Sequence, residues 1–141
     1  MINQVMRGAE TEMLVASKLI QKGANISFPI SHHNEYDMIA DINNHLIKIQ
    51  VKRAFIINSH GKEYLAIGTK RQMTRKSSVS RIRTKEYSDY GYDFLIACDV
   101  ENQDFWIIPR EYTIKYKSQI YLTTEHTIQF KNKWSVIGMI E

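Results

Sequence analysis

The chain has 141 residues, of which 43% are hydrophobic and 24% are charged, and its net charge is +4. This length and this apolar content suit one core, so we expect a single domain over residues 1–141. No run approaches the roughly 18 apolar residues of a membrane helix, and the first residues lack the apolar run of a signal peptide. We therefore expect a cytoplasmic, intracellular protein that has no membrane partner.

A helix is predicted over residues 3–22, because apolar residues recur there at helical spacing and Gly23 follows. Glu12 lies within the apolar stripe of this helix, seven residues from Val5 and seven from Leu19. A carboxylate in such a stripe is costly unless it is paired, protonated or bound to a cation. Glu12 is therefore a candidate site residue.

Two alternating runs, residues 36–42 and 45–57, follow on either side of Asn43-Asn44. Asparagine tolerates a positive φ, so this dipeptide predicts a tight hairpin. If the residues that flank the turn pair with each other, Asp37 lies opposite Gln50, and directly opposed residues share a face of the sheet.

The same alternation gives the hairpin one apolar face and one polar face. Asp37, Gln50 and Lys52 share the polar face. The helix packs its apolar side most simply on this sheet, which would bring Glu12 to the group. Further strands are predicted over residues 64–68, 93–99 and 105–108, and the one cysteine, Cys98, is expected to be a buried strand residue.

Residues 70–85 carry seven basic side chains and no acid, whereas the remaining 12 Lys and Arg against 15 acids leave the rest of the chain at −3. The segment shows no strand or helix period, so we expect an extended or mobile loop that contacts phosphates, although a solvated loop without a partner remains an alternative. Its basic residues, the candidate DNA contacts, are Lys70, Arg71, Arg75, Lys76, Arg81, Arg83 and Lys85.

The grouping of Glu12, Asp37, Gln50 and Lys52 suits phosphodiester hydrolysis. Carboxylate oxygens of Glu12 and Asp37 are ligands that Mg²⁺ prefers, and the Gln50 amide oxygen and the backbone carbonyl of Val51 are candidate further ligands. Lys52 would stabilise charge on the phosphate or help to deprotonate the attacking water.

These residues resemble the motif of the PD-(D/E)XK nuclease superfamily, with Tyr in place of Pro and Gln in place of the second acid. The Gln-X-Lys form is similar to that of some group I intron homing endonucleases, and the Gly-X3-Glu helix start is also similar to that of archaeal Holliday junction resolvases. The segments that carry the resemblance are Gly8-Ala9-Glu10-Thr11-Glu12, Tyr36-Asp37 and Ile49-Gln50-Val51-Lys52.

The resemblance implies an α/β fold with a restriction-endonuclease-like core, in which helices flank a mixed central sheet. It also implies dependence on Mg²⁺, for which Mn²⁺ would substitute, and a homodimer or homotetramer. Because the glutamine removes one negative ligand, another acid such as Glu10 or Glu35 is a candidate to assist.

The activity that follows is that of a metal-dependent DNA endonuclease from a mobile element or phage, associated with the nucleoid. Two alternatives remain open. One is a structure-selective Holliday junction resolvase, and the other is a non-catalytic DNA-binding protein that retains the fold.

Overall fold

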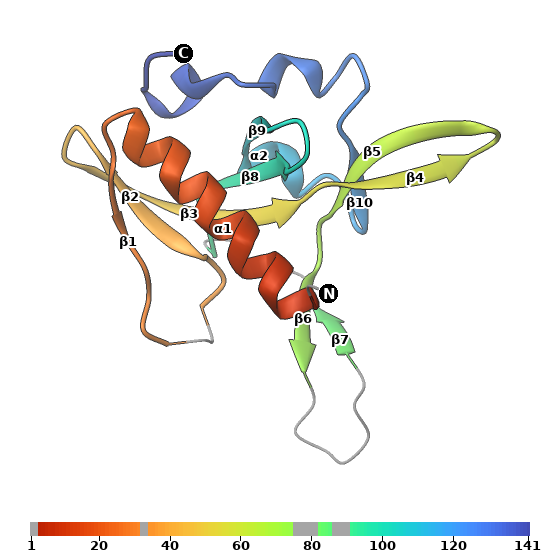
Figure 1. Ribbon diagram of the computed structural model, residues 1–141, viewed down its shortest axis with the longest axis horizontal. Coiled ribbons are helices and arrows are strands. Elements are labelled where there is room, and N and C mark those ends of the chain that lie inside the picture. Colours follow the sequence, from red (N-terminus) through yellow and green to blue (C-terminus); the bar gives the residue numbers. More distant parts are fainter. Residues whose placement is uncertain (1–2, 32–33, 75–81, 86–90) are drawn as a thin grey trace.

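The computed structural model describes residues 3–31, 34–74, 82–85 and 91–141, and its centre is a five-stranded sheet of order β1-β2-β3-β8-β9 (Figure 1). Strands β3 and β8 are parallel, and the other neighbours are antiparallel, so the sheet is mixed as predicted. The five strands are β1 (Asn25–Ser27), β2 (Met38–Ile42), β3 (His45–Arg53), β8 (Phe94–Asp99) and β9 (Asp104–Pro109).

The β2–β3 hairpin has the register that the sequence predicts. Asn43 and Asn44 have φ values of 52° and 68°, as a two-residue primed turn requires. Ile42 pairs with His45, and the last pair of the ladder joins Met38 to Ile49.

The long run that was predicted over residues 45–57 is two strands. At the end of β3, the N–H of Ala54 donates to the carbonyl of Cys98 at 2.9 Å, after which the chain leaves the central sheet. It continues as β4 and turns at His60 and Gly61, which both have positive φ. A second sheet of order β10-β5-β4 results, composed of β4 (Phe55–Ser59), β5 (Lys62–Gly68) and β10 (Gln119–Tyr121).

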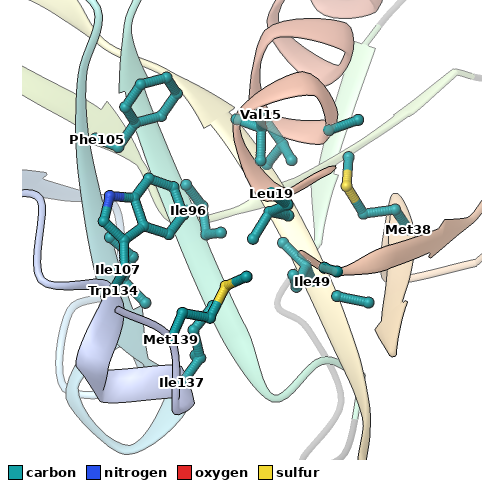
Figure 2. Packing of buried hydrophobic residues seen from close by; sticks show 14 of the residues in the cluster. Val15, Leu19, Met38, Ile49, Ile96, Phe105, Ile107, Trp134, Ile137 and Met139 are labelled. Atoms are coloured by element: carbon teal, nitrogen blue, oxygen red, sulfur yellow. The ribbon is translucent and has the colours of Figure 1, made fainter. Parts of the chain in front are cut away.

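Helix α1 (Gln4–Gln21) covers one face of the central sheet. Its buried residues Val15 and Leu19 point toward Met38, Ile49 and Ile96 of the strands, and the segment that carries Trp134, Ile137 and Met139 closes the other side of this core (Figure 2). Cys98 belongs to the same core as a free thiol, as expected, and burial raises its pKa to about 11.

The other face of the central sheet packs against the second sheet. Leu95 and Ile108 of the central sheet form a second buried cluster with Ile67 and Ile120 of the second sheet. The predicted α/β fold is thus confirmed, with a long helix on one face and mainly a small sheet on the other. The short helical elements are α2 (Arg110–Thr113), η1 (Ile128–Phe130) and η2 (Trp134–Ile137).

Strands β6 (Arg71–Thr74) and β7 (Ile82–Lys85) pair only with each other and form a two-stranded ribbon that projects from the body of the protein, as does the β4–β5 hairpin (Figure 1). Among the described residues, no helix is long and apolar enough to cross a membrane.

Candidate active site

Glu12 is half-buried where α1 leaves the sheet. Asn3 caps the start of the helix, because its side chain accepts the N–H of Met6 at 3.0 Å. Only the second half of the predicted apolar stripe is covered, because Val5 is 82% exposed whereas Val15 is fully buried. Glu12 therefore lies at the rim of the core and not in the middle of a covered face, so its carboxyl group can reach both protein and solvent.

Asp37 directly precedes β2, at the point where β2 and β3 separate. Its N–H donates to the carbonyl of Ile49 at 2.8 Å, and its side-chain Oδ2 accepts the N–H of Val51 at 2.7 Å. Two backbone contacts with β3 thus hold the residue beside Gln50, as the predicted register requires.

The carboxyl groups of Glu12 and Asp37 line the same cleft and interact with each other. Burial, the charge of Asp37 and hydrogen bonding with its side chain raise the pKa of Glu12 from 4.5 to about 7. Burial also raises the pKa of Asp37, although the Val51 N–H, Glu12 and the charge of Lys52 oppose the change. Two half-buried carboxyl groups that lie this close repel each other when both are charged, so a cation would stabilise the pair.

Gln50 and Lys52 project from the face of β3 opposite to the one that α1 covers. Gln50 is 8% exposed, and its Nε2 donates to the carbonyl of Val51 at 3.3 Å. The Nζ of Lys52 donates to the backbone carbonyl of Lys70 at 3.0 Å. Burial lowers the pKa of Lys52, and the charge of Asp37 opposes that change.

Asp37 thus links the two faces of the sheet. It contacts Glu12 on the helix side and interacts electrostatically with Lys52, which projects on the other side. The helix packs on the sheet, as expected, but not on the polar face. The group converges because Asp37 lies just before the first residue of β2, where its side chain can interact with both neighbours.

An open cleft of about 340 Å³ gives access to the two carboxyl groups. Its other lining residues come from the segment between β1 and β2. Because both carboxyl groups belong to the lining, a molecule bound in this cleft would lie against both of them. The residues that line it are Glu12, Phe28, Pro29, Ser31, Asn34, Tyr36 and Asp37. A second open cleft of about 450 Å³ lies between the β4–β5 hairpin and the β8–β9 turn and has neither carboxyl in its lining.

A sequence-family model of PD-(D/E)XK endonucleases matches residues 2–137. The chain belongs to the PD-(D/E)XK endonuclease family. Among solved structures, that of the bacterial homing endonuclease I-Ssp6803I matches with a TM-score of 0.82 and 20% identity, over 96% of this chain and 93% of that one. This likeness shows the fold. No curated protein matches the chain.

The donors of this candidate site fit a hard divalent cation. Glu12 and Asp37 offer carboxylate oxygens, and the carbonyl of Val51 and the amide of Gln50 lie beside them. In the described part of the chain, no group of three or more His, Cys, Asp and Glu side chains could hold a metal. One or two carboxylates are enough for Mg²⁺, which keeps several waters.

The two acids that were candidates to assist have neighbours of their own. Glu10 forms an ion pair with Arg53 at 2.7 Å, a contact that no sequence pattern indicated. Glu35 lies beside Gly91, where a Cβ atom would come 2.8 Å from its Oε2.

The basic segment is only in part what the sequence predicted. Arg71 pairs with Lys85, and Met73 pairs with Arg83, so residues 71–74 and 82–85 are strands. The expectation of a loop without strand structure is wrong there, because cross-strand hydrogen bonds are made by the backbone and do not require an alternating apolar pattern. Lys70 directly precedes β6. The predicted contacts Arg75, Lys76 and Arg81 lie outside the described residues.

Proposed function

We propose that this chain is a metal-dependent endonuclease that hydrolyses phosphodiester bonds of DNA, with Glu12, Asp37, Gln50 and Lys52 as its catalytic residues. The observation that carries the proposal is that Glu12 and Asp37 line one open cleft and interact with each other beside the charge of Lys52. Membership of an endonuclease family supports the reaction class.

The oxygen donors of Glu12, Asp37, Gln50 and the Val51 carbonyl would hold Mg²⁺, for which Mn²⁺ would substitute. When bound, the ion supplies positive charge to the phosphoryl oxygens and lowers the pKa of an attacking water. The N–H of Val51 orients the carboxylate of Asp37 toward the cleft. Glu12, whose pKa is raised to about 7, would lose its proton when a cation binds.

Lys52 acts on the phosphate. Its amine is a compact charge on a flexible stem, suited to stabilising the negative charge that develops as the P–O bond breaks. Burial makes that charge more effective, because a dry site screens it less than water does.

Residues 70–85 would contact the DNA backbone, since seven basic side chains without an acid attract phosphates in any base sequence. The structural likeness to a bacterial homing endonuclease supports a mobile-element origin and action at the intracellular DNA of the nucleoid. Cleavage of both strands of a DNA duplex requires an active site for each strand. We therefore expect a homodimer or homotetramer.

The test is cleavage of supercoiled plasmid and of a four-way junction with Mg²⁺ or Mn²⁺. Asp37→Asn and Lys52→Ala are compared with the wild type, and Asp41→Asn and Lys48→Ala serve as matched controls on the same two strands. Metal-dependent products that disappear in the first two variants and persist in the controls would establish the site.

Other outcomes separate the alternatives. Cleavage of the junction with little cleavage of linear duplex at fixed salt would indicate a resolvase. DNA binding without any metal-dependent product, and without a change in affinity on Asp37→Asn, would indicate a non-catalytic DNA-binding protein.

A further inference from the structure

The amine of Lys52 is held by the backbone of a distant segment. Its Nζ donates to the carbonyl oxygen of Lys70 at 3.0 Å, and both residues are half-buried. Lys70 lies between the end of β5 and the start of β6. The short connection between these strands therefore determines where the amine can lie.

Thr69 anchors this connection. It is only 8% exposed, its N–H donates to the carbonyl of Ser118 at 2.9 Å, and its hydroxyl donates to the carbonyl of Tyr116 at 3.1 Å. Both acceptors lie just before β10, whose Gln119 pairs with Gly68. The peptide that ends in the Lys70 carbonyl is thus tied to the second sheet.

The anchor bears on the chemistry because a lysine side chain has a flexible four-carbon stem. A catalytic group that is held by a fixed partner spends more of its time in the productive geometry. The charge of Lys52 interacts with Asp37, so a shift of the amine would change the field at the carboxyl pair.

We propose that Thr69 is a positioning residue for cleavage, whose side-chain and backbone hydrogen bonds fix the Lys70 carbonyl that aims the amine of Lys52. The inference rests on the proposed function, because that proposal gives Lys52 the role of stabilising negative charge on the DNA phosphate. It adds a residue that touches neither DNA nor metal. No sequence motif indicates it.

The first test compares Thr69→Val with Thr69→Ser in the full-length protein. Valine keeps the shape and the backbone N–H but removes the hydroxyl, whereas serine keeps the hydroxyl. The single-turnover rate at saturating DNA should fall about tenfold in Thr69→Val, the size of one lost hydrogen bond that supports a charged group. The dissociation constant for DNA should not change, and Thr69→Ser should restore most of the rate.

Thr127→Val is the matched control. Thr127 is 1% exposed, and its hydroxyl donates to the carbonyl of Tyr121 at 2.9 Å, so the same kind of bond is lost without contact to Lys52. An equal loss of rate in Thr127→Val, or an unchanged rate in Thr69→Val, would overturn the proposal.

A second measurement needs no cleavage. The ¹⁵N resonance of the Lys52 side-chain amine, assigned from its loss in Lys52→Arg, reports whether the amine has a fixed partner. It should move toward the position of exposed lysines in Thr69→Val and stay unchanged in Thr127→Val. A resonance that Thr69→Val leaves in place overturns the inference even if the protein cuts DNA, and a resonance that moves supports it even if no DNA is cut.

Discussion

The carboxyl groups of Glu12 and Asp37 line the same cleft and interact with each other, although one comes from a helix on one face of the sheet and the other directly precedes a strand. A carboxyl pair of this kind retains a proton near neutral pH, because two adjacent negative charges that are partly removed from water repel each other. A proton and a divalent cation compete for the same oxygens, which makes metal binding, pH and stability linked quantities.

Metal binding should release a proton below the raised pKa of Glu12, which is about 7. We expect Mg²⁺ affinity to increase as the pH rises through this value, because deprotonation of Glu12 completes the ligand set. Calorimetric titration in two buffers of different ionisation enthalpy, at about pH 6 and about pH 8, measures the number of protons released. A heat of Mg²⁺ binding that is independent of the buffer at the lower pH would contradict the raised pKa of Glu12.

The stability of the metal-free protein should also depend on Glu12. Its folded-state pKa of about 7 lies above the ordinary value of 4.5, so the folded state binds more protons between these two values. The contribution of Glu12 to the free energy of unfolding is fully present below pH 4.5 and is lost as the pH rises through about 7. Glu12→Gln should therefore raise the melting temperature above neutral pH by a few degrees. Glu63 is an exposed residue of β5. Glu63→Gln is therefore the control and should not change the melting temperature in this way.

Asp37 accepts a hydrogen bond from the N–H of Val51 in addition to its proposed role in cleavage. Two substitutions separate these two roles. Asn at position 37 keeps an oxygen that accepts the N–H of Val51, whereas Ala leaves that part-buried N–H without its acceptor. Asp37→Ala should lower the free energy of unfolding by about 1–3 kcal/mol relative to Asp37→Asn, and both variants should lose cleavage. Urea unfolding measures the difference. Equal stability of the two variants would mean that the contact with Val51 contributes nothing.

Gly91 packs closely against Glu35, which lies two residues before Asp37 in the chain. A Cβ atom at this position would lie 2.8 Å from the Oε2 of Glu35 and 3.0 Å from its Cβ. Gly91→Ala should destabilise the protein by about 1–3 kcal/mol, the usual cost of overpacking, and should slow cleavage because Glu35 lies two residues before Asp37. Gly8→Ala is the control in the melting experiment, because a Cβ on Gly8 meets nothing within 4 Å. A melting temperature of Gly91→Ala at or above that of the wild type would show that Glu35 moves aside at no cost.

The parts of the site that sequence reasoning recovered are those with local rules. Asn43 and Asn44 set the turn, the turn sets the register, and the register places Asp37 next to Gln50. Glu12 was recognisable because a carboxylate interrupts an apolar stripe.

The parts that were missed depend on tertiary contacts. The split of β3 and β4 at Ala54 requires a hydrogen bond to Cys98, and the pairing of Glu10 with Arg53 requires the packing of α1. Neither leaves a periodic signal in the sequence. The Thr69 anchor belongs to the same class, since its partners lie at residues 116–118.

The basic segment gives the last prediction, which concerns affinity and not catalysis. The variant with alanine at Lys70, Arg71, Arg75 and Lys76 should bind DNA more weakly, and the slope of log affinity against log salt should flatten by about 3 to 4, because each lost phosphate contact removes one released counterion. The loss should be similar for unrelated base sequences.

The matched control removes the same charge from the four exposed lysines of the C-terminal quarter, Lys115, Lys117, Lys131 and Lys133. If the control flattens the slope as much as the first variant does, net charge alone drives binding and residues 70–85 are not the phosphate contact. If only the first variant flattens it, DNA contacts the protein next to Lys70, whose carbonyl holds the amine of Lys52.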